Sequence, residues 1–434
     1  MKVAFITLGC RVNAYESEAM AEKFLKSGFE IVNHDEKADV YVINTCTVTN
    51  MGDRKSRQMI SKARKLNKDA VIAAVGCYSQ VEPQKVSQID GVDIVLGTRN
   101  KGDIIDYVNE FMDEKKQIVN VKDVFRDKKF EDLNIDEYQD KTRAFLKIQD
   151  GCNRFCSYCL IPYARGGVCS KEPSKVISEM KRLAAHGFKE IILSGIHIAS
   201  YGVDLKEDWN LMDIIEKAEE IDGIERIRIG SIEPRFFDDA TIEKIKNMKK
   251  LCHHFHLSLQ SGCTETLKRM NRRYTAEEYK AIVNKLRENI KDVSITTDVI
   301  VGFPGETDEE FQETYDFLRE IHLSKMHIFK YSPREGTKAA AMKNQIDGKV
   351  KEARSARLIE LDKINEEKFM TGFLGREMKV LFEKNFENHY NLYEGYTPNY
   401  IRVVVESDED ISKKILKVKL MSFKDNHLRG ELVN

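Results

Sequence analysis

The stretch that decides the fold is Asp150-Gly151-Cys152-Asn153-Arg154-Phe155-Cys156-Ser157-Tyr158-Cys159-Leu160-Ile161-Pro162, in which three cysteines are spaced Cys-x3-Cys-x2-Cys. Three ligands are one too few for a closed site, because a structural zinc takes four protein ligands and a four-iron cluster offers four irons. The triplet therefore leaves one metal position open for a substrate or a cofactor. The alternatives are a zinc ribbon that lacks a ligand and a chance cluster, but the sequence shows no second Cys-x2-Cys pair.

The triplet follows the first of six strand candidates, which are residues 145–149, 190–195, 226–231, 254–260, 294–301 and 326–331. Helical patterns separate these strands at residues 174–186, 211–220, 239–248, 276–289 and 308–321. Six strands are fewer than the eight of a closed TIM barrel, so we expect a partial (β/α)6 barrel with a lateral opening. Sites in such sheets form at the carboxyl ends of strands, which is where the triplet lies.

A second group of cysteines lies in the N-terminal region, residues 1–112. Strand patterns at residues 2–8, 39–44, 70–75 and 92–96 alternate with helical patterns at 16–27 and 53–66, which predicts a doubly wound α/β domain with a parallel sheet. Cys10, Cys46 and Cys77 each follow a different strand, so we expect them to meet at one edge of the sheet. Each alone could be a buried core cysteine. Together they indicate a second three-ligand site.

The remaining regions complete the expected domain organisation. Residues 113–142 are polar and charged, which predicts a linker before the barrel domain, residues 143–345. A charged connecting helix is expected over residues 346–370, and the β-rich residues 371–434 predict a small barrel of about five strands. The run His253-His254-Phe255-His256 resembles a metal site, but it lies on a strand candidate, so we expect packed or hydrogen-bonded histidines.

Composition limits the function classes. The chain has 434 residues, is 41% hydrophobic and 32% charged, and contains no apolar run long enough to span a bilayer, so we expect no membrane contact and a cytoplasmic location. Its nine cysteines then indicate metal binding or catalysis rather than disulfides. A net charge of −1 means that a nucleic-acid partner would bind local patches. The candidate RNA-binding residues are Arg54, Lys55, Arg57, Arg64, Arg272 and Arg273, although such basic stretches are more often solvated faces.

These motifs carry a family resemblance. The loop with Tyr158 before its third cysteine resembles that of the radical S-adenosylmethionine superfamily, and the three upstream cysteines make the chain similar to the methylthiotransferases over nearly its whole length. The similar stretches include Gly9-Cys10-Arg11-Val12-Asn13, Asn44-Thr45-Cys46-Thr47-Val48-Thr49, Gly76-Cys77-Tyr78, Ser258-Leu259-Gln260-Ser261-Gly262 and Gly302-Phe303-Pro304-Gly305-Glu306-Thr307. The stretch Gly395-Tyr396-Thr397-Pro398-Asn399-Tyr400-Ile401-Arg402-Val403 resembles the TRAM RNA-binding domain.

Three branches of that family differ in substrate. One modifies isopentenyladenosine in tRNA, one an aspartate of a ribosomal protein, and one N6-threonylcarbamoyladenosine in tRNA. The stretches at residues 8–16 and 47–58 resemble the third branch most. One departure is Arg165-Gly166-Gly167-Val168-Cys169-Ser170-Lys171, where relatives more often carry further arginines. A noncatalytic iron–sulfur protein that binds RNA or acts as a sensor is the alternative from another class.

The resemblance implies two [4Fe–4S] clusters with different roles. The cluster on Cys152, Cys156 and Cys159 would bind S-adenosylmethionine and generate a 5′-deoxyadenosyl radical. The cluster on Cys10, Cys46 and Cys77 would hold the sulfur, and a second S-adenosylmethionine would supply the methyl group. The implied cofactor contacts are Tyr158, Ser194, Gly195, Ser231, Glu233, Gln260 and Asp298. The implied partners are tRNA, an external electron donor and a sulfur source.

Overall fold

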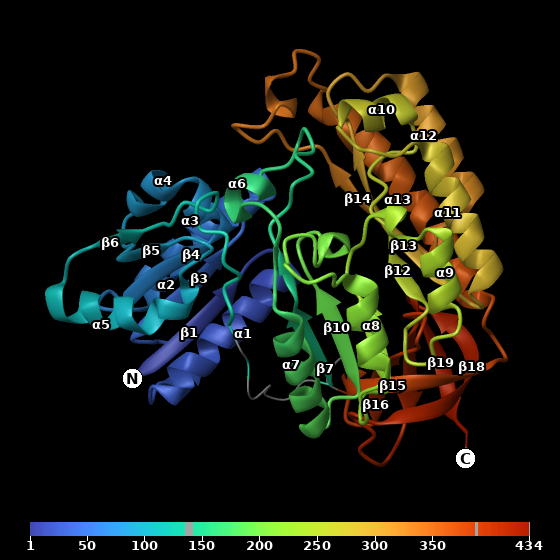
Figure 1. The fold of residues 1–434 in the computed structure, drawn as a ribbon, viewed down its shortest axis with the longest axis horizontal. Helices are drawn as coiled ribbons and strands as arrows, with labels where there is room; N and C mark the ends of the chain where they lie inside the picture. The colour runs from blue at the N-terminus through green and yellow to red at the C-terminus, as the bar shows by residue number, and fades with distance from the viewer. Residues whose placement is uncertain (134, 136–141, 387–388, 434) are drawn as a thin grey trace.

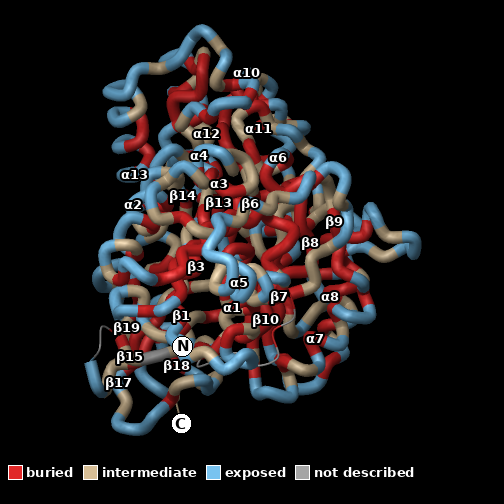
Figure 2. The backbone as a smooth tube through the Cα atoms, turned by 90° about the vertical axis from the view of Figure 1, so that its left-hand side faces the viewer, coloured by how far each residue is buried: buried red, intermediate tan, exposed pale blue. Residues whose placement is uncertain are grey.

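A computed structural model describes residues 1–133, 135, 142–386 and 389–433 and confirms the predicted α/β architecture. Figure 1 shows an N-terminal parallel sheet, a central partial barrel and a small closed β-barrel near the C-terminus. Part of the expected linker, residues 134 and 136–141, lies outside the described residues. Figure 2 shows that the strands of the sheets run through the buried interior, whereas exposed turns belong mainly to the surrounding helices and loops.

The N-terminal sheet has six parallel strands in the order β2-β1-β3-β4-β5-β6. Their bounds are Glu30–Val32, Lys2–Thr7, Val40–Thr45, Val71–Gly76, Ile94–Leu96 and Ile118–Asn120. One core cluster joins the sheet to α1 and α5, and another joins the opposite face to α2, α3 and α4. These helices span Arg11–Lys26, Ile104–Glu114, Asn50–Leu66, Cys77–Val81 and Pro83–Ser87. The domain is therefore doubly wound, and its strand order reverses direction between β1 and β3, where such folds bind ligands.

The structure adds elements that the sequence did not predict. Helix α1 begins at Arg11, five residues before the expected start at Glu16, with Cys10 as its N-cap. The edge strands β2 and β6 and the helix α5 also went unpredicted, and β6 lies within the expected linker. Both edge strands are three residues long and none of their residues is buried, so neither shows a recognisable hydrophobic period.

The central domain consists of two three-stranded parallel sheets, β11-β10-β7 and β12-β13-β14. Isolated β-bridges beside β11 and β12 join the two sheets into one curved wall. From β7 to β14 the strands span Arg143–Lys147, Glu190–Ser194, Arg226–Ile229, His254–His256, Ser294–Val301 and Lys325–Lys330, and a small pair, β8 (Gln149–Asp150) and β9 (Cys169–Ser170), flanks the site. The helices are α6 Ile161–Arg165, α7 Pro173–Ala185, α8 Leu211–Glu219, α9 Asp239–Ile245, α10 Thr264–Arg269, α11 Ala276–Asn289 and α12 Asp308–Ile321. This arrangement confirms the partial barrel.

Alternate residues of these strands face opposite sides of the wall. The outer residues, such as Leu146, Leu193, Ile227 and Phe255, belong to the core shared with the helices. The intervening positions, which include Lys147, Ser194 and Arg228, therefore face the barrel interior. Most of the interior residues are polar, as an interior that receives a polar substrate requires.

The N-terminal domain contacts both edges of the open barrel. At the β7 edge, the Arg11 guanidinium lies over the Phe145 ring, 4.8 Å from its centre. Beyond the β14 edge, Arg334 donates to Asn50, Thr47 and Asp53 near the start of α2, with a distance of 2.6 Å to the Asp53 carboxylate. The N-terminal domain thus bridges the lateral opening between β7 and β14 (Figure 1).

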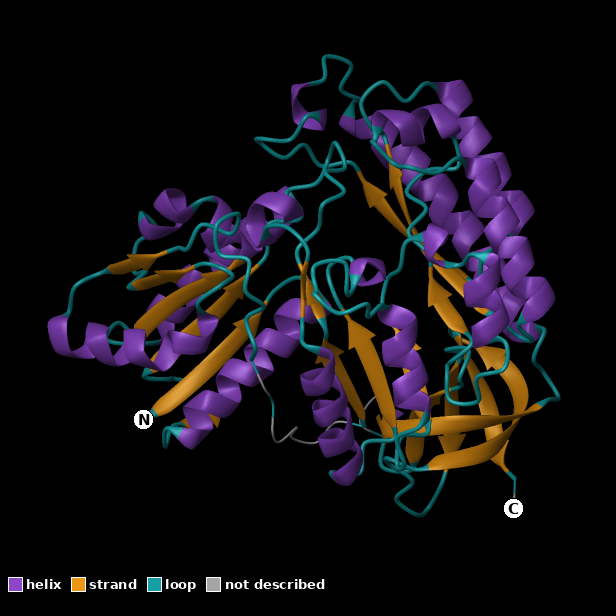
Figure 3. Cartoon of the chain, in the orientation of Figure 1, coloured by secondary structure: helices purple, strands orange, loops and turns teal. Residues whose placement is uncertain are grey.

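The C-terminal part begins with the long helix α13, Gly348–Thr371, which packs against β14. Five strands then close into a barrel in the order β15-β16-β17-β19-β18, as expected for a TRAM-like domain. They span Glu377–Asn385, Leu392–Tyr396, Arg402–Glu406, Ile415–Lys424 and His427–Leu432. Figure 3 shows this strand-rich body below the helices of the central domain. Among the described residues, no helix combines the length and apolarity needed to cross a membrane.

Candidate active site

The three N-terminal cysteines lie together at the carboxyl edge of the sheet, as predicted. Cys10 caps α1 after β1, Cys46 directly follows β3, and Cys77 starts α3 after β4. Cys10 lies close enough to the other two that its charged form would raise the pKa of Cys46 and of Cys77. All three therefore surround the reversal point between β1 and β3 and the neighbouring end of β4.

Glycines make room around Cys46. A Cβ atom on Gly9, which has a φ of +99°, would lie 2.8 Å from the Cys46 Sγ, and one on Gly52 would lie 3.6 Å from it. The first distance is shorter than any real carbon–sulfur contact without a bond, so only glycine fits at position 9 in this conformation. Asn13 ties the same two segments together, because its side-chain amide donates to the Leu8 carbonyl at 2.8 Å and to the Thr45 carbonyl at 3.0 Å.

The central triplet lies in the loop between β8 and α6. Backbone N–H groups of Arg154 and Ile161 donate to the sulfurs of Cys152 and Cys159, each at 3.4 Å. The Arg272 guanidinium donates to the Cys156 sulfur at 3.4 Å and to the Ser258 carbonyl at 3.1 Å. The loop is thus fastened to the interior side of the barrel, just beyond the end of β12.

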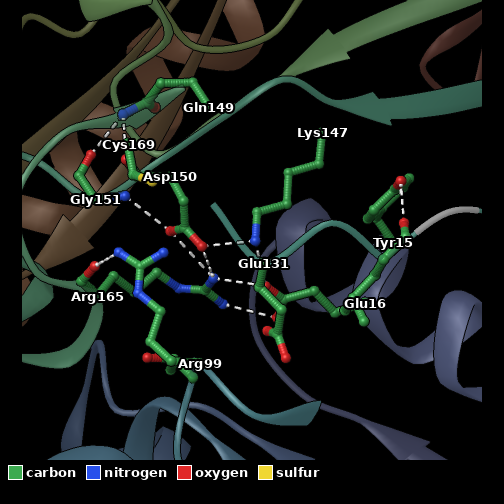
Figure 4. A network of polar contacts seen from close by, with 12 residues as sticks. Tyr15, Glu16, Arg99, Glu131, Lys147, Gln149, Asp150, Gly151, Arg165 and Cys169 are labelled. Carbon is green, nitrogen blue, oxygen red and sulfur yellow. Dashed lines mark hydrogen bonds and ion pairs between the residues drawn. The ribbon is translucent and has the colours of Figure 1, made fainter. Parts of the chain in front are cut away.

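Arg165 connects the two triplets. It ends the short helix that follows Cys159, yet its Nε donates to the Cys77 sulfur at 3.3 Å. Its two terminal nitrogens donate to Glu16 at 2.7 and 3.1 Å and to Asn13 at 2.6 Å. Figure 4 shows this guanidinium between the carboxylates of Glu16 and Asp150, and Lys147 beside the same two carboxylates.

The network around Arg165 is largely buried and, among the described residues, contains one more cation than carboxylate. The carboxylates are Glu16, Asp150 and Glu131, and the cations are Arg165, Lys147, Lys101 and Arg99. Burial would raise the pKa of Glu16 and of Asp150, but the surrounding cations hold both pKa values well below the usual range. A thiolate at Cys77 would balance the remaining cation.

Both triplets suit iron–sulfur ligation. Burial raises the pKa of Cys77 to about 11 and of Cys159 to about 12, so neither thiol ionises at neutral pH without a metal. Iron supplies the positive charge that stabilises the thiolates, and soft sulfur ligands suit such clusters. In the central triplet, the Arg154 N–H points at the Cys152 sulfur and the Arg272 guanidinium at the Cys156 sulfur. In the N-terminal triplet, the Arg165 guanidinium points at the Cys77 sulfur. Such donors are typical around cluster sulfurs. The residues present therefore fit a cluster at each triplet.

Polar residues from β8 to β11 converge beside the central triplet. The side-chain oxygen of Gln149 accepts from the His197 N–H at 2.7 Å, and a Cβ on Gly195 would lie 2.8 Å from that oxygen. The Glu233 carboxylate meets the His197 ring at 3.0 Å and also the Arg154 guanidinium. These two partners lower the pKa of Glu233 to about 2 against the opposing effect of burial.

The other residues predicted to contact the cofactor lie around the same rim. Ser194 is buried at the end of β10, Ser231 is exposed after β11, and Tyr158 packs edge-on against Phe303 at 6.4 Å. Gln260 has a φ of +77°, which is rare for a residue with a side chain and common at functional sites. Asp298 faces the interior from β13, further from Ser194 along the wall. The structure thus brings Ser194, Gly195 and Glu233 together and leaves Asp298 on the opposite half.

The predicted RNA-binding residues fall into two groups. Arg54, Lys55 and Arg57 are exposed on α2, and Arg273 is exposed after α10. Arg64 instead donates to the carbonyls of residues 68, 70 and 91 and to the Asp93 carboxylate. Arg272 holds Cys156, as described above. Arg64 and Arg272 thus already have hydrogen-bond partners within the protein, unlike the exposed basic side chains at positions 54, 55 and 273.

Several site residues were missed by sequence reasoning. Arg154 and Asn13 lie within the two cysteine motifs, and that position is the only sequence signal that singles them out. Arg165, His197 and Gln149 show no such signal, since their partners lie up to 152 residues away. The Arg165 contacts form between the two domains, whereas the contact of His197 with Gln149 forms within the central domain.

Comparisons with known proteins agree with this site. A family model described as the Radical SAM superfamily matches residues 146–318, and one described as uncharacterized protein family UPF0004 matches residues 2–97. The solved structure of the radical S-adenosylmethionine methyltransferase TsrM from Kitasatospora setae has a TM-score of 0.56. It is 14% identical and covers 76% of each chain, a likeness that concerns the fold alone.

Curated relatives extend over nearly the whole chain. Threonylcarbamoyladenosine tRNA methylthiotransferase MtaB of Bacillus subtilis is 42% identical, covering 99% of this chain and 96% of that protein. The protein of the same name from Aquifex aeolicus is also 42% identical, with 96% and 99% covered. The tRNA-2-methylthio-N(6)-dimethylallyladenosine synthase of Alkaliphilus oremlandii is 36% identical, with 100% and 93% covered. The chain therefore belongs to the radical S-adenosylmethionine methylthiotransferase family.

Proposed function

We propose that this protein inserts a methylthio group at C2 of N6-threonylcarbamoyladenosine, next to the anticodon of tRNA. The observation that carries the proposal is the 42% identity to two threonylcarbamoyladenosine tRNA methylthiotransferases, which extends across both cysteine-bearing domains. Family membership makes the chain a radical enzyme with a [4Fe–4S] cluster and S-adenosylmethionine, rather than a noncatalytic iron–sulfur protein.

The two cysteine triplets would hold two separate [4Fe–4S] clusters. Cys152, Cys156 and Cys159 would hold the first, and Cys10, Cys46 and Cys77 the second. When bound, the first cluster with S-adenosylmethionine supplies the radical, the second cluster holds the sulfur, and a further S-adenosylmethionine supplies the methyl group. The open position at each triplet supports these roles, since each has three cysteines and a four-iron cluster has four irons.

The chain's own residues would orient the cofactor. Gly195 allows a close approach beside Gln149, because a side chain there would strike the Gln149 amide. Glu233 stays ionised, so its carboxylate can accept hydrogen bonds from hydroxyl or ammonium groups of S-adenosylmethionine. Ser194, Ser231 and Tyr158 would complete the contacts from neighbouring positions. Gln260 and Asp298 are the two predicted contacts that this cluster of residues does not include.

The tRNA would bind across the exposed basic face of α2. Arg54, Arg57, Lys62 and Lys65 line a shallow surface pocket there, and Lys55 is exposed on the same helix. This helix begins four residues after Cys46 and is fixed to the barrel through Arg334, so its basic face lies near the mouth of the interior. Arg273 and the C-terminal barrel would add contacts to the RNA.

The proposed function also implies external donors, a location in the cell and a division into domains. An external reductant would supply the electrons and an external donor the sulfur. Bacterial tRNA is modified in the cytoplasm, where we place the enzyme. The expected boundaries are 1–112, 113–142, 143–345, 346–370 and 371–434. We move the first of them to Asn120, because β6 belongs to the N-terminal sheet, and propose the others unchanged, with the last segment as the TRAM domain.

Nucleoside analysis tests the proposal. Deletion of the gene should remove 2-methylthio-N6-threonylcarbamoyladenosine from tRNA and leave the unmethylthiolated nucleoside, and the wild-type gene should restore it. Persistence of the modified nucleoside in a strain with no second enzyme would contradict the substrate. Loss of the isopentenyladenosine derivative, or of the modified ribosomal-protein aspartate, would assign the chain to another branch.

A further inference from the structure

Three neighbouring strands place polar side chains at one level of the barrel interior. His256 belongs to β12, Asp298 to β13 and His327 to β14, and all three occupy positions that alternate with core residues. Asp298 and His327 are direct partners in the parallel ladder, while His256 pairs with Thr296, two residues before Asp298. We call these three residues the interior triad.

The interior triad is compact and held in place. One nitrogen or oxygen from each residue lies within 4.8 Å of the others. The His256 Nδ1 lies 3.0 Å from the Thr296 hydroxyl, which leaves its Nε2 directed at the Asp298 carboxylate, 3.3 Å away. The His256 and His327 rings stack with centres 5.8 Å apart. Although buried, the His256 Nε2 has no hydrogen-bond partner of good geometry within the described chain.

The interior triad is accessible from the barrel. His327 is exposed and Asp298 is half-buried, although both lie on the inner face of the wall. Phe329, the next interior position on β14, is 48% exposed. Protein side chains therefore do not fill the interior at this level. A ligand that enters can reach His327 and Asp298, whereas the buried Nε2 of His256 lies against the Asp298 carboxylate.

The position of the interior triad relative to the central triplet is fixed by β12 and its continuation. Ser258, whose carbonyl accepts from Arg272, is the next interior-facing position after His256, and Arg272 in turn contacts the Cys156 sulfur. Two residues along an extended chain span about 7 Å. His256 thus lies one interior position below Ser258, and Asp298 and His327, two residues further along their strands, lie nearer still to the residues that hold the central triplet.

We propose that the interior triad binds the polar substituent on N6 of the target adenosine. This proposal rests on the proposed function, in which that substituent is the threonylcarbamoyl group, with a carboxylate, a hydroxyl and amide N–H groups. The imidazole N–H of His327 can donate to its carboxylate, and Asp298, which His256 holds in place, can accept from its hydroxyl or N–H groups.

The same triad would reject a dimethylallyl group. That substituent has no polar atoms, so its binding would strip water from three polar side chains without replacing the lost hydrogen bonds. Sites built to hydrogen-bond a substrate discriminate strongly against analogues that lack the polar group. The interior triad would therefore determine which N6-modified adenosine the enzyme accepts.

The experiment uses the anaerobically reconstituted full-length enzyme and two anticodon stem-loop RNAs, one with N6-threonylcarbamoyladenosine and one with unmodified adenosine. Dissociation constants are measured for both RNAs and for S-adenosylmethionine, together with kcat and KM. The variants are Asp298→Asn and His327→Gln. The control is His186→Gln, which changes an exposed histidine at the end of α7.

We expect each variant to weaken binding of the modified RNA by about tenfold or more, because each loses a hydrogen bond to a charged group. Binding of the unmodified RNA and of S-adenosylmethionine should not change, and the loss in kcat/KM should come mainly from KM. The control should match the wild type in every measurement.

Three results would overturn the inference. Unchanged discrimination between the two RNAs would show that the interior triad does not contact the substituent. Weaker S-adenosylmethionine binding in Asp298→Asn would return Asp298 to its predicted cofactor role. Stoichiometric zinc in the wild type that is lost in both variants would make the interior triad a metal site. Failure of the proposed function itself would look different, because the wild type would then not prefer the threonylcarbamoyl RNA at all.

Discussion

Replacement of Arg165 by methionine removes a side chain that contacts both the Cys77 sulfur and the carboxylates of Glu16 and Asp150. In the structure its guanidinium is completely buried and donates to Glu16, Asp150, Asn13 and Cys77. Methionine has a similar length and no charge, so Arg165→Met removes these interactions with little change in packing.

The expected loss of stability is large. Removal of one partner from a buried ionic network costs about 3–5 kcal/mol, because the remaining charges stay buried without compensation. For a cooperative unit of about 150–250 residues, each kcal/mol shifts the melting temperature by about 2–4 °C. Arg165→Met should therefore melt about 6–20 °C below the wild type. Arg165→Lys keeps the charge but cannot form the paired contacts with Glu16. Its melting temperature should therefore lie between those of the wild type and Arg165→Met.

Two measurements check this prediction on the anaerobically reconstituted protein. Thermal unfolding compares the three proteins, and redox titration followed by electron paramagnetic resonance gives the midpoint potential of each cluster. The loss of a positive charge 3.3 Å from the Cys77 sulfur should lower the potential of the cluster at that triplet and leave the other nearly unchanged. A Met variant that melts with the wild type and keeps both potentials would refute the reasoning.

Three further predictions follow from other contacts. Glu190 lies in the barrel interior among Arg228, Arg226 and Arg143, which hold its pKa below the usual 4.5, so Glu190→Gln should cost about 3–5 kcal/mol at neutral pH. Because a lowered folded pKa stabilises above the unfolded pKa, the difference in melting temperature from the wild type should shrink as pH falls below about 4.5, and a constant difference would contradict this account. Arg334→Ala should speed hydrogen–deuterium exchange in the first turn of α2, whereas exchange in α11, far from this contact, should not change. Alanine at Arg54, Lys55 and Arg57 together should reduce the slope of log K against log salt for tRNA by about 0.7 per lost phosphate contact, whereas Lys181→Ala, at an exposed site on α7, should leave the slope unchanged.

Elements with complete local signals could be predicted from the sequence. The predicted bounds of α11 and α12 match the structure because each helix begins with a capping box, Thr275 with Glu278 and Thr307 with Glu310. Strand β13 also matches, since six of its eight residues are β-branched. The convergence of Cys10, Cys46 and Cys77 followed from the rule that parallel strands end at the same edge.

The rest depends on packing between distant segments. The roles of Arg64 and Arg272 could not be predicted, because exposed and buried arginines look alike in a sequence. The partner of Arg165 is 149 residues away, and the interior triad combines residues from three strands whose register no local pattern sets. The Arg165 contacts form where the N-terminal domain meets the barrel, whereas the others form within one domain between strands or loops distant in sequence.

The central claim is that each cysteine triplet holds its own cluster and that the two clusters have different roles. The most direct test is the variant with Cys10, Cys46 and Cys77 all changed to alanine, reconstituted anaerobically beside the wild type. The wild type should carry about eight irons and the variant about four, since each site holds a four-iron cluster. The variant should still cleave S-adenosylmethionine to 5′-deoxyadenosine but should form no methylthiolated tRNA. An unchanged iron content, or loss of 5′-deoxyadenosine formation in the variant, would contradict the account.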